Sequence, residues 1–182
     1  MEKEFVDATV GANIPIQFMP AIQKGYFEAM EKGPQIGVPV VGVRMVITDG
    51  QAHPVDSNEI AFRTASVYGF REGFKNANPV ILEPIMTVEI TAPAEFQGTI
   101  MGGLNKRKGA IQSTDTANDT VTVICEVPLN NMFGYSTDLR SCTQGKGEFV
   151  MEYARHAAVP REDTQKLITE FAKKREQEKK LV

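Results

Sequence analysis

The sequence lacks long apolar runs, has few cysteines and contains no phosphate-binding loop. Hydrophobic residues make up 42% of its 182 residues, but no apolar run approaches the roughly 20 residues of a membrane-spanning helix. We therefore expect a soluble globular protein with one or two hydrophobic cores and no membrane partner. No Gly-x-x-x-x-Gly-Lys-[Ser/Thr] sequence occurs, which excludes a nucleotide hydrolase that relies on such a loop.

Cysteine is too scarce for a disulfide framework or a zinc site. Cys125 and Cys142 are the only two, and neither belongs to a Cys-x-x-Cys pattern or has a histidine nearby. This arrangement predicts buried, reduced thiols. We expect no metal and no cofactor in this chain.

Positive charge is also limited. The formal net charge is -3, and basic residues outnumber acidic ones only in the tail, residues 155–182. A protein held to nucleic acid by bulk charge would be basic throughout. Any RNA contact must therefore be local, or a larger particle must hold the protein in place.

The most informative stretch is the polar segment Asp49 to Glu59. An alternating apolar run over residues 38–48 predicts a strand that leads into it, and an amphipathic run over residues 57–77 predicts a helix that follows it. Asp49-Gly50 is typical of a strand-ending turn. The segment should therefore form a projecting tip between a strand and a helix.

His53 is the residue that this tip would present. Pro54 keeps His53 extended, and Ser57 followed by Asn58-Glu59 supplies side chains able to cap the following helix, with Asp56 and Ser57 as the preferred caps. His53, Asp56 and Ser57 have the residue types of a hydrolytic triad, but adjacent Asp56 and Ser57 make the required geometry awkward. A tip histidine instead suits contact with an RNA base or phosphate. The alternative is a polar connector with an incidental histidine.

Residues 1–83 predict an incomplete unit. A helix over residues 14–32, the strand at 38–48, the helix at 57–77 and a short extended segment near Phe5 leave a sheet with an open edge. We expect a longer parent chain to supply further material before residue 1. The second helix should bury the following residues: Ile60, Ala61, Ala65, Val67, Tyr68 and Phe74.

Residues 84–154 predict a ferredoxin-like domain, which makes the chain an α+β protein. Strands are expected near residues 86–91, 110–113, 120–127 and 147–153, with helices over 94–104 and 128–144, a basic turn over 105–109 and a polar loop over 114–119. This order is that of the split βαβ fold. Leu82-Glu83-Pro84 is the expected hinge before it. Phe133 is expected on the apolar face of the second helix.

The tail, residues 155–182, predicts a helix with a narrow apolar stripe and charge elsewhere. The stripe consists of Leu167, Ile168, Phe171 and Ala172. Because one short stripe needs a surface to pack on, we expect this helix to return to the first unit.

Four long motifs carry a resemblance to a known family. They are Asn13-Ile14-Pro15, His53-x-Val55-Asp56-Ser57-x-Glu59-x-Ala61-Phe62, Leu82-Glu83-Pro84-Ile85-Met86, and Val127-Pro128-Leu129-x-x-Met132-Phe133-Gly134-Tyr135-Ser136-Thr137-x-Leu139-Arg140-Ser141. Over nearly all of residues 5–155, the sequence resembles the C-terminal third of translation elongation factor G, the ribosomal translocase. Variants such as Glu95-Phe96-Gln97-Gly98 most resemble the mitochondrial form.

The resemblance implies a domain plan. Residues 1–83 resemble the C-terminal part of the family's tip domain, whose fold is similar to the second domain of a small-subunit ribosomal protein. Residues 84–154 resemble the ferredoxin-like domain that follows, and residues 155–182 the helix that returns to the first domain. A strand and a first tip loop of the family should precede residue 5.

The resemblance also implies a function and its partners. The family's tip contacts transfer RNA and messenger RNA in the decoding region, and the matching histidine is His53, flanked by Gln51 and Pro54. Lys106, Arg107 and Lys108 match a turn that contacts ribosomal RNA, the alternative being a solvated loop. We expect a monomeric, non-enzymatic ribosome-binding part of a GTPase.

The family's GTP and magnesium belong to an N-terminal domain that this chain lacks. The compartment implied is the mitochondrial matrix, or the cytoplasm if the source is bacterial. The alternative function is ribosome recycling, or ribosome binding without GTP, by a member of the same family.

Overall fold

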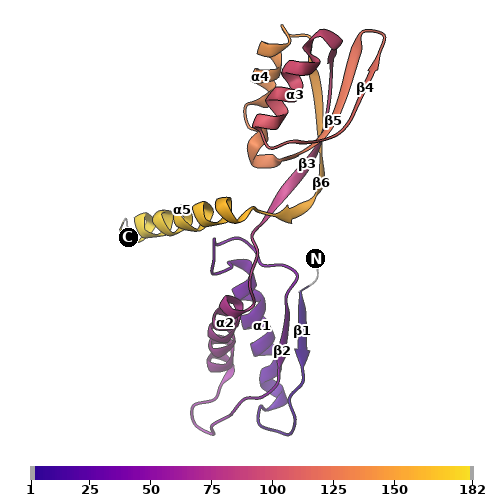
Figure 1. Cartoon of the computed structure of the whole chain (residues 1–182). Coiled ribbons are helices and arrows are strands. Elements are labelled where there is room, and N and C mark those ends of the chain that lie inside the picture. The colour runs from indigo at the N-terminus through magenta and orange to yellow at the C-terminus, as the bar shows by residue number, and fades with distance from the viewer. Residues whose placement is uncertain (1–2, 181–182) are drawn as a thin grey trace. The chain divides into compact units, whose positions relative to one another are not determined.

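The chain is an α+β protein, as predicted, and divides into two compact units. A computed structural model describes residues 3–180 (Figure 1). The first unit contains the residues up to Pro79 together with those from Arg161 onward, and the second contains Val80–Pro160.

In the first unit, two short parallel strands accompany two packed helices. The elements are β1 (Glu4–Asp7), the short 3-10 helix η1 (Ile16–Phe18), α1 (Met19–Glu31), β2 (Arg44–Ile47), α2 (Glu59–Asn76) and α5 (Arg161–Lys180). In the β1–β2 ladder Phe5 lies opposite Met45. The pairing of the two strands is reinforced by an ion pair of 2.7 Å between Arg44 of β2 and Glu4 of β1.

The two helices α1 and α2 approach each other closely at Gly25. A Cβ at Gly25 would lie 2.3 Å from the backbone oxygen of Arg63 in α2, so only glycine permits this approach. Ser66 lies at the same interface, and its hydroxyl donates a hydrogen bond of 2.7 Å to the carbonyl of Ile22. Tyr26 and Phe70 are buried beside them, with ring centroids 5.6 Å apart.

The buried face of α2 differs from the predicted one. Residues at spacing four, from Phe62 through Ser66 and Phe70 to Phe74, are buried or half-buried. Ile60 and Tyr68 are 75% and 62% exposed, and Ala61 and Ala65 are exposed as well, so the predicted burial of these four residues is wrong. The apolar pattern gave the wrong face because one residue of the buried face is polar. Ser66 can be buried there since its hydroxyl donates to the carbonyl of Ile22.

The predicted long strand at residues 38–48 is also wrong. Only Arg44–Ile47 is strand. Gly42 has a φ of +69°, which interrupts an extended run. Before it, the N–H of Val40 donates to the carbonyl of Met30 at 2.7 Å, so this segment follows the end of α1 instead of joining a ladder.

Within the first unit, helix α5 packs on the loop after α1 at a glycine. Gly37 has a φ of +71°, and a Cβ built on it would lie 2.6 Å from the Phe171 ring. Phe171, Leu167 and Ile168 are half-buried, while most of their neighbours on α5 are exposed.

The second unit is a four-stranded antiparallel sheet with two helices on one face (Figure 1). Its elements are β3 (Leu82–Pro93), η2 (Ala94–Phe96), α3 (Gln97–Lys106), β4 (Ala110–Ala117), β5 (Thr120–Pro128), η3 (Leu129–Met132), α4 (Tyr135–Cys142) and β6 (Glu148–Ala158). The strand order is β4-β5-β3-β6, and every pairing is antiparallel. The ferredoxin-like prediction is confirmed.

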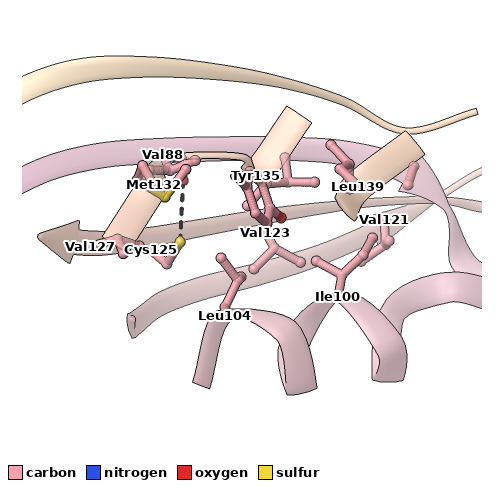
Figure 2. Packing of buried hydrophobic residues seen from close by; sticks show 12 residues of the cluster. Val88, Ile100, Leu104, Val121, Val123, Cys125, Val127, Met132, Tyr135 and Leu139 are labelled. Atoms are coloured by element: carbon pink, nitrogen blue, oxygen red, sulfur yellow. Dashed lines mark hydrogen bonds between the residues drawn. The ribbon is translucent and has the colours of Figure 1, made fainter. Parts of the chain in front are cut away.

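Alternate residues of the central strands build the core of this unit. Val121, Val123, Cys125 and Val127 of β5 are all fully buried, because alternate side chains of a strand share one face. Ile100 and Leu104 of α3 and Tyr135 and Leu139 of α4 pack onto this face, as Figure 2 shows.

The cysteines are free thiols in different surroundings. Cys125 is fully buried and its Sγ lies 3.7 Å from the carbonyl of Val88 (Figure 2). Burial raises the pKa of this thiol to about 11, because a thiolate is disfavoured away from water. Cys142 is only half-buried.

Three predictions about where elements of the second unit begin and end are wrong. Leu82, Glu83 and Pro84 are regular residues of β3 that pair with the end of β6, so the chain has no break at the predicted hinge and β6 runs past its predicted end. The predicted polar loop at 114–119 is mostly strand. Only Asn118 and Asp119 turn, with φ of 51° and 60°, values that these residue types tolerate.

Helix α4 starts later than predicted, at Tyr135 instead of residue 128. Residues 129–132 form a 3-10 turn, and Gly134, with a φ of +75°, separates that turn from α4. Phe133 is therefore 75% exposed, instead of facing the core as predicted, while Tyr135 is buried.

Candidate nucleic-acid interface

The base of the segment that follows β2 is held by side chains from the loop before α1. The Asn13 amide donates to Oδ1 of Asp49 at 3.1 Å, and the N–H of Gly50 donates to the same oxygen at 2.8 Å. These two bonds hold the pKa of Asp49 below its ordinary value of 3.8, because both stabilise the carboxylate. Ile14 is buried and packs against Gly50. A Cβ built on Gly50 would lie 2.4 Å from Cδ1 of Ile14.

The end of the loop is closed by reciprocal bonds between His53 and Ser57. The N–H of His53 donates to Oγ of Ser57 at 2.7 Å, and the N–H of Ser57 donates to the carbonyl of His53 at 3.1 Å. The N-cap of α2 is Asn58, whose Oδ1 accepts from the N–H of Ala61 at 2.9 Å. Asn58, one of the residues predicted to cap this helix, is thus the observed cap, and the preference for Asp56 and Ser57 is wrong.

The ring of His53 is oriented by its own loop. The Nδ1 atom accepts from the N–H of Val55 at 3.3 Å and lies 3.4 Å from Oδ2 of Asp56, while the side chain is 67% exposed. Nδ1 is therefore the ring nitrogen that is engaged within the loop.

These contacts exclude the hydrolytic arrangement. The Ser57 hydroxyl is engaged by the backbone of His53 and not by its imidazole, whereas a triad requires the ring to take the hydroxyl proton. What the loop offers is a fixed surface. Gln51 and Pro54 are exposed on it. Val55 is 82% exposed at the same place, a residue that the sequence prediction did not single out.

In the predicted basic turn at the end of α3, Arg107 is held in contacts within the fold and is not a solvated cation. The Arg107 guanidinium donates to the carbonyls of Asn131 and Phe133, the latter at 3.1 Å, and to Asp138. It also lies 5.2 Å from the Tyr135 ring centroid, and its side chain is only 18% exposed. Arg107 thus binds the turn to η3 and α4.

The neighbours of Arg107 face outward. Lys106 ends α3 and is exposed. Lys108 is also exposed and has a φ of +59°. The structure brings Lys106, Arg107 and Lys108 together in the second unit and the residues Gln51, His53 and Pro54 together in the first.

The described residues contain no cluster of three or more potential metal ligands. Within the same residues, every helix is too short or too polar to cross a membrane.

Two family models match this chain in succession. Residues 2–78 match elongation factor G, domain IV, and residues 80–167 match the elongation factor G C-terminus. Their junction falls close to the division between the two compact units at Pro79 and Val80.

Individual relatives agree with these matches. Mitochondrial elongation factor G-1 of Arabidopsis thaliana is 53% identical over 169 residues, which cover 93% of this chain and 22% of the relative. A crystal structure of a protein from Thermus thermophilus has a TM-score of 0.80 and 33% identity, covering 94% of this chain and 26% of that one. This chain thus spans about a quarter of the length of these relatives. It belongs to the elongation factor G family and corresponds to domain IV followed by the C-terminal domain.

Proposed function

We propose that this chain is the ribosome-contacting C-terminal part of a translational GTPase that moves transfer RNA and messenger RNA through the ribosome. Its two units match the domains that follow one another in elongation factor G. GTP and magnesium would bind elsewhere in the longer protein, since this chain spans 22% of the Arabidopsis relative. The compartment proposed is the mitochondrial matrix, after the name of that relative.

The observation that carries this proposal is the rigid presentation of His53. Its backbone is fixed by Ser57 and its Nδ1 by Val55, while the side chain is 67% exposed. An oriented, exposed imidazole can bond a phosphate oxygen or a 2′-hydroxyl, or stack on a base. Exposed Gln51 and Pro54 extend this surface, and Lys106 and Lys108 supply a second contact, to ribosomal RNA phosphates.

A paired histidine substitution tests the proposal. In the full-length factor that contains this chain, His53→Ala should slow translocation about 10-fold or more while ribosome-stimulated GTP hydrolysis stays near wild type. His156→Ala is the matched control, because the only other histidine of the chain bonds Tyr153 at 2.6 Å in the second unit. A contribution of about 1.4 kcal/mol to the barrier corresponds to that factor.

Rapid kinetics of both reactions on the same ribosomes gives the answer. Equal loss of translocation and GTP hydrolysis in His53→Ala would contradict the proposal, as would an unchanged translocation rate. Normal translocation with defective subunit recycling would favour the recycling function instead.

A further inference from the structure

A hollow of about 580 Å³ lies between helices α3 and α4 of the second unit. Its walls include Ile100 of α3 and Leu139 of α4, which also belong to the hydrophobic core. Gly102 and Gly103 line it too, and nothing lies within 4 Å of a Cβ built on either of them. The volume is in the range of small-molecule sites, about 300–1,000 Å³, which are mostly apolar with a few polar groups.

Tyr135 places a buried polar atom without a partner at this hollow. Its side chain lines the hollow and is 4% exposed, and its hydroxyl has no hydrogen-bond partner in the part of the chain that the structure describes. Burial is the first cause that raises the pKa of this hydroxyl, and the charges of Cys142, Arg107 and Asp138, which also line the hollow, act on it as well. Because a buried hydroxyl without a partner costs free energy, it marks a place where a bound molecule can supply the missing bond.

Lys106 gives the wall of the hollow an uncompensated positive charge. The other cation in this wall, Arg107, is paired with Asp138. Lys106 is exposed and, within residues 3–180, takes part in no ion pair. An unpaired ammonium beside an apolar wall favours a ligand that joins a negative charge to an apolar body.

We propose that this hollow is a binding site for a small organic anion with an apolar body. The apolar body lies against Ile100 and Leu139, the negative group pairs with Lys106, and a polar atom of the ligand bonds the Tyr135 hydroxyl. This site is independent of the proposed ribosome contact and goes beyond it.

Titration of the 182-residue chain with anilinonaphthalene sulfonate tests whether the hollow binds such a molecule. This dye joins a sulfonate to an apolar aromatic body through an N–H group, and we expect the amide NMR shifts that it causes to be confined to α3, α4 and their turns. Gly102→Leu fills the hollow and should weaken binding about 10-fold or more. Gly98→Leu is the matched control with unchanged affinity, because Gly98 of α3 also has open space at its Cβ but does not line the hollow.

The same dye without its sulfonate, phenylnaphthylamine, tests the polar contacts. Lys106→Ala should weaken binding of the sulfonate dye by up to about 5-fold, the contribution of one exposed ion pair, and leave the affinity for the neutral dye unchanged. Tyr135→Phe should weaken binding of both dyes about 2- to 10-fold, because both retain the N–H group that the hydroxyl can bond.

Equal weakening by Gly102→Leu and Gly98→Leu would overturn the site, as would NMR shifts spread over both units. It would also be overturned if Lys106→Ala changed the affinity for both dyes equally, or if Tyr135→Phe changed neither. Should Gly102→Leu fail to fold, which its NMR spectrum shows, Lys106→Ala and Tyr135→Phe decide the question. None of these measurements involves ribosomes, so their failure leaves the proposed function standing.

Discussion

The side-chain amide of Asn13 donates a 3.1 Å hydrogen bond to the carboxylate of Asp49, a residue 36 positions later in the chain. This bond joins the loop before α1 to the base of the His53 loop. Two motifs that are separate in the sequence, Asn13-Ile14-Pro15 and the loop of His53, are therefore in contact in the fold. The exposed ring of His53 depends on a base that the other motif holds.

Replacement of Asn13 by alanine should raise the pKa of Asp49 toward its ordinary value of 3.8. The wild-type pKa is lowered, first by the Asn13 amide and then by the N–H of Gly50. The stability from this carboxylate is therefore present above its unfolded-state pKa and is lost as the pH falls through the lowered folded-state pKa. NMR titration of the Asp49 carboxyl measures the shift, and an identical pKa in both proteins would contradict this account.

The close approach of α1 and α2 gives a second prediction. Gly25→Ala should destabilise the first unit by about 1–3 kcal/mol or more, because the added Cβ would lie 2.3 Å from a backbone oxygen of Arg63. Gly69→Ala is the matched control in α2, where nothing lies within 4 Å of the added atom. The control should stabilise the helix by up to about 1 kcal/mol. Urea unfolding of both variants measures the difference, and similar changes in the two would refute the steric argument.

Tyr135 gives the third prediction, because its hydroxyl is the one buried side-chain polar atom without a hydrogen-bond partner among the described residues. Burial is the first cause that raises its pKa above the ordinary value of 10.0. Tyr135→Phe removes an unsatisfied polar group and should stabilise the second unit by about 1 kcal/mol. Tyr153→Phe, at a 58% exposed site, should change stability by less than about 0.5 kcal/mol. Thermal unfolding distinguishes them, and a destabilised Tyr135→Phe would mean that the hydroxyl has a partner in solution.

The sequence predicted the element order of the second unit because glycine, proline and asparagine stand at its turns. Gly109, Pro128 and Gly145 are such markers. The same reasoning misplaced Phe133, whose spacing fits an apolar helix face, because the left-handed Gly134 starts the helix after it. An apolar residue just before a glycine at a helix start is therefore ambiguous from periodicity alone.

The candidate site was predictable in its location but not in its contacts. A polar segment between apolar runs identified the loop of His53. No sequence rule indicated that Ser57 would bond the backbone of His53 while Asn58 capped the helix, since both residue types cap helices equally well. Likewise, Arg107 reads as one of three solvated cations, and only the fold shows that it binds the turn before α4.

The most direct test of the account is to identify what the His53 loop touches on the ribosome. Val55 is 82% exposed beside His53, so a Val55→Cys variant of the full-length factor can carry a photoreactive probe. Cys142 is replaced in this variant, and Cys125 is fully buried. On ribosomes halted during translocation, the probe is predicted to crosslink to transfer RNA or messenger RNA. Crosslinks confined to ribosomal proteins, with neither RNA labelled, would contradict a contact between the His53 loop and the moving RNAs.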